Sequence, residues 1–511
     1  MMNLVAAPVL ISLMTAVVLL ALNHRPGTQR IVSIVSHLLL VASAVGLLVP
    51  TLAGEVLVLT LGNWAPSVGI TWVADGLSAV MVFFALITSL LVLIYSEGTF
   101  DEGDGVRNYF HPLHHLLLAG VCGSFLTGDF FNLFVFFEIM LLASFAMISL
   151  GARPRQLNLT FPYVLVNLVG STLLLGGIGA VYGTVGTVNM AEVSLAIQTQ
   201  ELPAAFWAGV GLILLVFATK AALLPLFFWL PDAYPIAPIA VNALFASLLS
   251  KVGVYTLFRS VPLITGGEVG VIQAVLVVVG AATMLIGVLG ALGRSGIRDI
   301  LSFHIVSQVG YMVFGLAVFT PLAVAAGLFY TVHNIIVKTG LIMAGGIAER
   351  MGGSQKLGVI KGVARTHPWV AAAFFVCAVA LAGLPPFSGF WGKFFLAVAG
   401  YQAGMYAATT IAIVVGLLTL SSMLKIWLSV FWGEPSGNKE PAFGNSKGML
   451  VPTLVLAGIA VVMGFGGGPI MHYSMVVAEN LLAVTPYVDG VMQAGGISAD
   501  DLAALREGVE R

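Results

Sequence analysis

The stretch Gly383-Leu384-Pro385-Pro386-Phe387-Ser388-Gly389-Phe390-Trp391-Gly392-Lys393 interrupts an apolar segment that runs from 368 to 399. Proline has no backbone N–H to donate and its ring crowds the preceding turn, so two prolines near the middle open the helix. Inside a membrane, the freed carbonyls are tolerated only where protein or water satisfies them. The stretch therefore predicts a broken membrane helix beside Lys393, lined by water or by neighbouring helices.

A second break is predicted in the segment 205–229, where Pro225 follows Lys220 by five residues. Pro225 cannot donate to the carbonyl of Ala221, so the helix should open at that point. Further prolines follow, at Pro231, Pro235 and Pro238. Two broken helices that lie five segments apart are typical of transporters with inverted repeats. We therefore expect two inverted five-helix repeats, formed by segments 4–8 and 9–13, with helices 7 and 12 broken.

The composition indicates a membrane protein, because 59% of the residues are hydrophobic, only 8% are charged and the mean hydropathy is +1.05. Apolar segments long enough to cross a bilayer lie near 3–22, 31–52, 70–95, 111–128, 130–150, 160–186, 205–229, 235–260, 269–293, 298–318, 321–349, 368–399, 404–432 and 449–470. The predicted fold class is an all-α polytopic membrane protein with fourteen transmembrane helices.

These segments predict four regions along the chain. Residues 1–110 hold helices 1–3, residues 111–260 the first repeat, and residues 269–432 the second repeat. Residues 449–511 hold helix 14 and a more polar tail, which could form a short surface helix. No extended soluble domain is present, so we expect no nucleotide or redox cofactor and no metal centre.

The placement of basic residues predicts the orientation of the chain. Thirteen lysines and arginines fall in the odd-numbered loops, against three on the even-numbered side and in the tail, of which Arg259 is one. Cytoplasmic loops carry the excess of positive charge. We therefore expect a multi-pass protein of the cell membrane with both termini external. The formal net charge of -1 gives no electrostatic reason to expect a nucleic-acid partner.

Five lysines and a glutamate lie well inside the apolar segments: Glu138, Lys220, Lys251, Lys338, Lys393 and Lys425. A lysine at the centre of a membrane helix costs about 2.5–3.5 kcal/mol on insertion scales. Such residues usually mark an ion or proton pathway, although a structural role beside backbone carbonyls is the alternative. Lys425 lies close to the end of its segment, so its side chain could instead reach the headgroups.

Several histidines also fall in or beside these segments. His304 and His333 could pass protons or simply fill buried positions. His333 and Lys338 are five residues apart, about 140° around a helix, so they need not touch. His111, His114 and His115 lie near a predicted membrane boundary, and a metal site there has no evident third ligand.

Four motifs carry a resemblance to a known family. They are Lys220 with the Pro225–Pro238 run, Ser247-Leu248-Leu249-Ser250-Lys251-Val252-Gly253, Ser307-Gln308-Val309-Gly310-Tyr311, and the Pro385–Lys393 stretch. The chain resembles the antiporter-like membrane subunits that are shared by proton-pumping NADH:quinone oxidoreductase and the Mrp cation/proton antiporters. The resemblance covers nearly the whole chain, and within the family the chain looks most like the D-type subunits of the Mrp complexes.

The resemblance implies a proton-translocating subunit of a multisubunit Na+/H+ antiporter, working with other membrane subunits. It implies an ion pair between Glu138 and Lys220, with Lys251 carrying the proton to the centre. His333 or Lys338 would then link the two halves, and Lys393 would deliver the proton to the far side. His304 and Lys425 are further candidates. Lysine suits this role because burial destabilises its charged form and lets it release a proton.

Two alternatives follow from the same residues. The first is the same fold in a redox-driven proton pump, where other subunits handle the electrons. The second is a stand-alone solute symporter or a purely structural membrane subunit. A symporter needs a polar substrate pocket, whereas the mid-segment residues here are proton-transfer groups. The identity of the subunits that co-purify with this chain would distinguish the antiporter subunit from these two alternatives.

Overall fold

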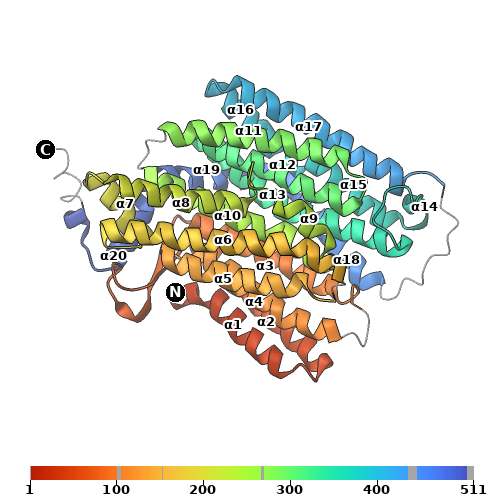
Figure 1. The fold of residues 1–511 in the computed structure, drawn as a ribbon, viewed down its shortest axis with the longest axis horizontal. Helices are drawn as coiled ribbons and strands as arrows, with labels where there is room; N and C mark the ends of the chain where they lie inside the picture. The colour runs from red at the N-terminus through yellow and green to blue at the C-terminus, as the bar shows by residue number, and fades with distance from the viewer. Residues whose placement is uncertain (1, 101–104, 152–153, 266–269, 435–445, 503–511) are drawn as a thin grey trace.

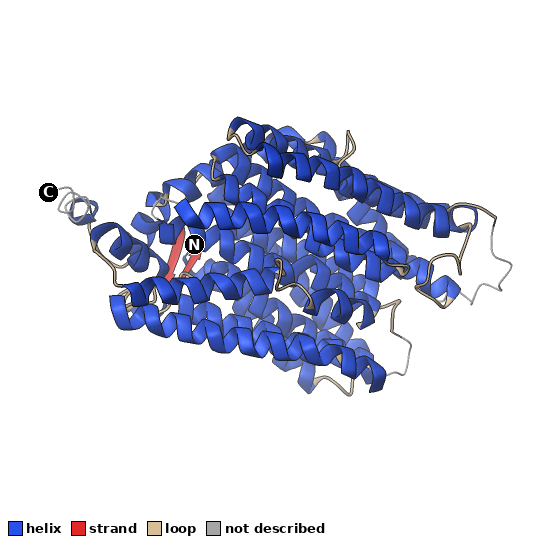
Figure 2. Cartoon of the chain, turned by 45° about the horizontal axis from the view of Figure 1, so that its top comes forward, coloured by secondary structure: helices blue, strands red, loops and turns tan. Residues whose placement is uncertain are grey.

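The computed structural model describes residues 2–100, 105–151, 154–265, 270–434 and 446–502. Long helices run side by side along one common direction and form a single bundle (Figure 1, Figure 2). The only sheet in this part of the chain is one short antiparallel hairpin, drawn red in Figure 2. Its strands β1 (Leu57–Thr60) and β2 (Thr71–Ala74) pair from Leu57 opposite Ala74 to Thr60 opposite Thr71.

The first half of the chain begins with short and long helices that flank this hairpin. These are η1 (Met2–Ala6), α1 (Ala7–Ala21), α2 (Pro26–Leu52), η2 (Leu61–Asn63) and α3 (Gly76–Ser96). The next group is α4 (Gly105–Leu126), α5 (Phe130–Ile148), α6 (Pro154–Val185), α7 (Met190–Thr199), α8 (Ala204–Ala221), α9 (Trp229–Ala233), η3 (Tyr234–Ile236) and α10 (Ile239–Thr265).

The second half continues with the same kind of helices. It comprises α11 (Gly270–Gly293), α12 (Ile297–Val318), α13 (Pro321–Gly352), α14 (Val363–Thr366), α15 (Pro368–Ala382), α16 (Ser388–Gln402), α17 (Tyr406–Ile426) and the π-helical turn η4 (Trp427–Phe431). The chain then forms α18 (Ser446–Phe465), α19 (Gly467–Ala483) and α20 (Thr485–Ala494).

Twelve helices in the described residues are long and apolar enough to cross a membrane. They match twelve of the fourteen predicted segments, and the count of fourteen is not confirmed. The predicted segment 111–128 corresponds to α4, whose asparagine and three histidines lower its apolarity. The predicted segment 368–399 is divided into α15 and α16, which have 15 residues each.

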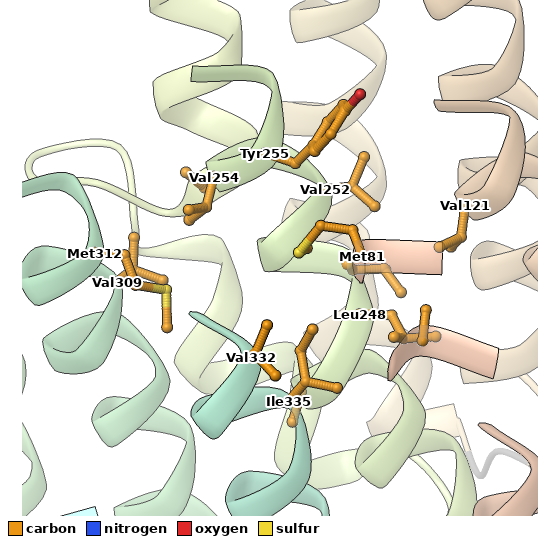
Figure 3. Close-up of a cluster of buried hydrophobic side chains, with 14 of the residues drawn as sticks. Met81, Val121, Leu248, Val252, Val254, Tyr255, Val309, Met312, Val332 and Ile335 are labelled. Atoms are coloured by element: carbon orange, nitrogen blue, oxygen red, sulfur yellow. The ribbon is translucent and has the colours of Figure 1, made fainter. Parts of the chain in front are cut away.

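Three helices form the interior of the bundle. The most apolar windows of α10, α12 and α13 are 100%, 94% and 94% buried, whereas those of α2 and α17 are only 33% buried. Figure 3 shows side chains from α3, α4, α10, α12 and α13 meeting in one apolar cluster. Lys251 and Arg259 of α10 and Lys338 of α13 are accordingly buried inside the protein.

Several helix boundaries of the first half recur in the second half at one common offset. The helix α6 spans 154–185 and α13 spans 321–352, while α10 begins at 239 and α17 at 406. Close packing repeats with the same offset. Gly120 and Gly123 of α4 lie against Met140 and Phe136 of α5, and Gly287 and Gly290 of α11 lie against Ser307 and Phe303 of α12. The sequence motifs alone did not reveal this register.

Both predicted breaks are present in the structure. The helix α8 ends at Ala221, and Ala222 takes a left-handed conformation with φ of 63°. The helix α15 ends at Ala382, and Gly383 has φ of 91°, which glycine adopts without steric cost. The second interruption is shorter than predicted, because the chain is helical again from Ser388.

The two ends of the bundle differ. Figure 1 shows the N-terminus and α20 at one end, and β1 there contacts both η1 and α20. The other end carries Arg30, Arg107, Arg298 and Arg350, and we call it the basic end. The predicted polar tail is more ordered than expected, because α19 packs against the interior helix α13. Residues 503–511 of that tail lie outside the described residues.

Candidate functional site

Lys393 closes the break between α15 and α16. Its Nζ donates to the carbonyl oxygens of Leu381 and Ala382, at 3.0 Å each. Those carbonyls lack helical partners, because prolines 385 and 386 have no N–H. Gly383 also leaves room for the lysine stem, since a Cβ there would lie 2.8 Å from Lys393 Cδ. The break and the lysine thus form one unit, as the sequence predicted.

Aromatic and polar side chains of α12 and α13 surround this ammonium group. Lys393 Nζ lies 4.8 Å from the centre of the Tyr311 ring and 6.0 Å from that of Tyr330. The hydroxyl of Tyr330 donates to Gln308 Oε1, and His333 stacks on the Tyr330 ring. His333 Nδ1 lies 2.8 Å from the hydroxyl of Ser388, the first residue of α16. Polar contacts thus connect α12, α13 and both sides of the break.

Lys220 differs from expectation, because its partner is an asparagine. Its Nζ donates to Asn167 Oδ1 at 3.0 Å, and Asn167 lies on α6. Glu138 on α5 is within electrostatic range of Lys220, but these two described residues form no ion pair within 4.0 Å. One carboxylate oxygen of Glu138 is buried without a hydrogen-bond partner among the described residues. The expected ion pair is therefore absent from this conformation.

Lys251 and Lys338 occupy the interior helices and are fully buried. Lys251 on α10 donates to the Ala246 carbonyl oxygen at 2.6 Å, and its Nζ lies 3.4 Å from Ser250 Oγ. Lys338 on α13 donates to the Leu301 carbonyl oxygen of α12 at 3.2 Å. Lys338 lies within electrostatic range of both Lys251 and Lys393. Its helix, α13, packs against both α10 and α16, which carry those two lysines.

His304 of α12 contacts α17, and Lys425 is a residue of α17 that contacts the end of α11. His304 Nε2 is 2.8 Å from the Ser422 hydroxyl. Lys425 Nζ donates to the carbonyl oxygens of Leu292 and Arg294, at 2.9 and 2.6 Å, where α11 ends. A cation at a helix C-terminus satisfies free carbonyls and complements the helix dipole. Lys425 therefore joins α17 to α11. From the sequence we expected this lysine either to take part in a proton pathway or to reach the headgroups, and neither expectation included this contact.

The lysines of this site share a chemical property. Each ammonium is held by carbonyl or amide oxygens, which carry no net charge. A carboxylate partner would strongly favour the charged lysine. An uncharged oxygen accepts a hydrogen bond from an amine as well as from an ammonium group. The arrangement therefore permits each lysine to gain and lose a proton without losing its position.

Asn167 was missed in the sequence, although a signal for it exists. Tyr163 and Asn167 are four residues apart, and Tyr330 and Asn334 repeat this pair at the offset that relates α6 to α13. In both halves the asparagine Nδ2 donates to the carbonyl of that tyrosine. Asn334 Oδ1 is buried and has no hydrogen-bond partner among the described residues. An internal comparison of the two halves would have identified both asparagines.

One cavity adjoins Lys393, and another lies at the basic end. The first, of about 330 Å³, lies between α16 and α17, with Tyr311 and Gly383 in its lining. The second, of about 310 Å³, lies beside the ion pair of Arg298 and Glu349. A water molecule occupies about 30 Å³ of liquid, so the cavity at the basic end, which Arg298, Glu349 and Thr99 help to line, can hold several.

A buried ion pair fixes the end of the bundle opposite the basic end. Arg259 of α10 contacts Asp75, the residue that caps the N-terminus of α3, at 2.6 Å. The sequence analysis counted Arg259 among the basic residues of the even-numbered side, whereas the structure places it within α10 and buries it. Burial raises the pKa of Asp75, but Arg259 and hydrogen bonds from Ser78 outweigh this and keep it below its usual value.

The chain matches known proteins over most of its length. Residues 127–419 match the family model described as NADH:quinone oxidoreductase/Mrp antiporter, TM. The chain is 39% identical to the D subunit of the Na+/H+ antiporter of Alkalihalophilus pseudofirmus and 34% identical to that of Bacillus subtilis. Both matches cover 96% of this chain and 100% of the relative. A chain in the structure of the Mrp complex from Dietzia sp. superposes with a TM-score of 0.90 at 35% identity, covering 96% of this chain and 100% of that one.

Proposed function

Since this chain belongs to the NADH:quinone oxidoreductase/Mrp antiporter family, as a D-type subunit of the multisubunit Na+/H+ antiporters, we propose that it carries the proton through the buried lysines. It is a transporter subunit rather than a catalytic enzyme, and the other membrane subunits of the complex are its partners. The proposal concerns the route of the proton and the residues that carry it.

One observation carries the proposal: four lysines, three of them buried and Lys393 partly buried, lie on four adjacent helices and are held by uncharged oxygens. They are Lys220 on α8, Lys251 on α10, Lys338 on α13 and Lys393 on α16. The helices α8, α10, α13 and α16 pack in that order. Backbone carbonyls can also hold a purely structural lysine. The proposal is favoured by the succession of such lysines on helices that pack against one another, because a proton route needs neighbouring groups that can hold the proton.

In this route a proton passes between Lys220 and Lys393 by way of Lys251 and Lys338. Glu138 would set the charge of Lys220 when the two approach more closely than here. His333, which is within electrostatic range of Lys338 and Lys393, would serve as the intermediate between them. His304 also lies within range of these two lysines. Lys425 has a structural role in this account.

The two halves would act as inverted repeats that give access from opposite sides. The common offset of their helix boundaries supports the pairing of α4–α10 with α11–α17. The excess of basic residues at one end supports a cytoplasmic basic end and external termini. The cavity at the basic end supports water access from that side, whereas the cavity beside Lys393 is lined mainly by apolar side chains of α16 and α17.

The proposed route is tested by measuring Na+/H+ exchange by the whole complex. The complex is purified with its native partner subunits and reconstituted in liposomes, and an imposed Na+ gradient drives a change of internal pH. Wild type should exchange, Lys220→Ala and Lys393→Ala should not, and Lys361→Ala, which alters an exposed loop lysine, should match wild type. Full exchange by both buried-lysine variants would refute the route. Co-purified flavin or iron–sulfur subunits would instead indicate a redox-driven pump.

A further inference from the structure

Four buried histidines gather away from the line of lysines, and we call them the histidine cluster. They are His37 on α2 and His111, His114 and His115 on α4, and each is at most 2% exposed. His111 and His115 are four residues apart, so they lie on one face of α4. The sequence placed the three α4 histidines near a membrane boundary, but they lie within the packed bundle formed by α1, α2, α3 and α4. The two helices of the cluster carry none of the four lysines of the proposed route.

A chain of short contacts links this cluster to Glu97. Glu97 Oε1 lies 3.3 Å from His111 Nε2. The other ring nitrogen, His111 Nδ1, lies 3.2 Å from Ser33 Oγ, and that hydroxyl lies 3.1 Å from His115 Nε2. An imidazole can accept a proton on one nitrogen and release it from the other. The four groups therefore form an uninterrupted sequence of proton donors and acceptors.

Glu97 connects this sequence to the surface at the basic end. It follows the last residue of α3 and contacts Arg107 and Arg30, whose side chain is 48% exposed. Burial raises the pKa of Glu97, but its contacts with His111, Arg107 and Arg30 outweigh this and leave the pKa below its usual value. Glu97 is therefore ionised at neutral pH and can stabilise a proton on His111.

The inner part of the cluster has free hydrogen-bonding capacity. The ring of His115 lies 5.7 Å from that of His37 and 5.6 Å from that of His114. In the described part of the chain, no partner is found for His37 Nδ1, His115 Nδ1 or either nitrogen of His114. Histidines that only fill space normally have their ring nitrogens satisfied. These nitrogens are therefore available to accept or donate a proton.

The cluster continues toward α13 through α3. His37 Nε2 lies 3.2 Å from Ser89 Oγ. The next residue toward the N-terminus, Thr88, is fully buried, and its hydroxyl has no partner among the described residues. Thr88 precedes Tyr95 by seven residues and shares its helix face, and Tyr95 donates to Met343 of α13. Thr88 therefore faces the helix that carries Lys338.

We propose that Glu97, His111, Ser33, His115 and His37 form a second proton relay, which joins the basic end of the bundle to the interior helices. This proposal rests on the proposed function and adds a branch to it. A proton reaches His111 Nε2, and the proton on Nδ1 passes to Ser33 Oγ while the hydroxyl proton passes to His115 Nε2. His111 and Ser33 then regain their starting charges, and His115 holds the transferred proton. The described residues contain no group of three or more metal-ligating side chains suited to a metal ion.

The relay is tested by removing one hydroxyl. Ser33→Ala removes the hydroxyl that bridges His111 and His115, and exchange by the reconstituted complex should fall on the order of tenfold. Ser43→Ala is the matched control, because Ser43 is also a buried serine of α2 and bonds only the Leu40 carbonyl. It should exchange like wild type. Ser33→Thr keeps the hydroxyl and should restore most of the rate.

The outcomes separate this proposal from the proposed function. A wild-type rate in Ser33→Ala overturns the relay, while loss of exchange in Lys393→Ala would still support the lysine route. Equal losses in Ser33→Ala and Ser33→Thr, at normal complex yield, would show a packing role and also overturn the relay. If Ser33→Ala does not assemble, His115→Gln gives the same test, and a wild-type rate in that variant overturns the relay.

Discussion

Asn167 and Asn334 make the same bond at equivalent positions of the two halves, but only one of them holds a lysine. Each asparagine donates from Nδ2 to the carbonyl of the tyrosine four residues before it. Asn167 Oδ1 accepts from Lys220, whereas Asn334 Oδ1 is buried and has no partner among the described residues. The two halves therefore differ in whether this asparagine oxygen accepts a hydrogen bond from a lysine.

This difference leads to the first prediction. If the halves alternate, Asn334 Oδ1 accepts a lysine in the other conformation, and Asn334→Leu should lower exchange although no cation contacts it here. Asn167→Leu, the matched variant, should lower exchange by a similar factor, on the order of tenfold, because each loses one hydrogen bond to a charged group. The measurement is the exchange rate of each variant and of wild type, compared at equal yield of the assembled complex. An unchanged rate in Asn334→Leu would mean that the empty acceptor is static.

Glu138 provides the second prediction. Glu138→Gln should abolish exchange and leave assembly intact, because the amide can no longer favour a charged Lys220. Glu138→Asp should keep part of the activity, because it retains the negative charge. Assembly is followed by co-purification of the partner subunits, and exchange by internal pH. The idea that this carboxylate controls Lys220 fails if the Gln variant exchanges like wild type.

Lys425 should matter for stability more than for exchange. It caps the end of α11 through Leu292 and Arg294, so Lys425→Ala should reduce stability by about 1 kcal/mol. Exchange should remain near the wild-type rate. Thermal unfolding of the purified complex measures the first effect, with Lys361→Ala as the control. A complete loss of exchange in a stable Lys425→Ala complex would place this lysine on the proton route.

The sequence was most informative where the chemistry is local. Proline and glycine ended the helices at Ala221 and Ala382, as predicted, because the missing N–H groups act on the same turn. The partner of Lys220 could not be predicted in that way, since Asn167 lies 53 residues away on another helix. The ion pair of Glu138 and Lys220 was expected from the resemblance, but it is not formed in this conformation. Only the internal repeat could have identified Asn334.

The ion pair of Asp75 and Arg259 predicts a pH effect on stability. The pKa of Asp75 is lowered from 3.8 in the folded protein, so its contribution is fully present above that pH. It is lost as the pH falls through the lower, folded-state pKa. Asp75→Asn should cost about 3 kcal/mol at neutral pH, since it leaves Arg259 buried without its carboxylate.

Unfolding measured between neutral and acidic pH tests this sign. The difference in stability between wild type and Asp75→Asn should shrink as the pH falls below 3.8. A difference that stays constant over this range would show that the carboxylate does not supply the stabilising charge.

The central claim is that Lys393 itself gains and loses the transported proton, and Lys393→Arg tests it most directly. Arginine keeps the positive charge and can donate to the Leu381 and Ala382 carbonyls, but it does not release its proton at working pH. Sodium-driven proton movement is measured in liposomes that contain the complete complex, beside wild type and Lys361→Arg. We predict that Lys393→Arg assembles normally and exchanges at least about a hundredfold more slowly. Wild-type exchange in Lys393→Arg would show that a fixed charge suffices, and the proton route through Lys393 would be wrong.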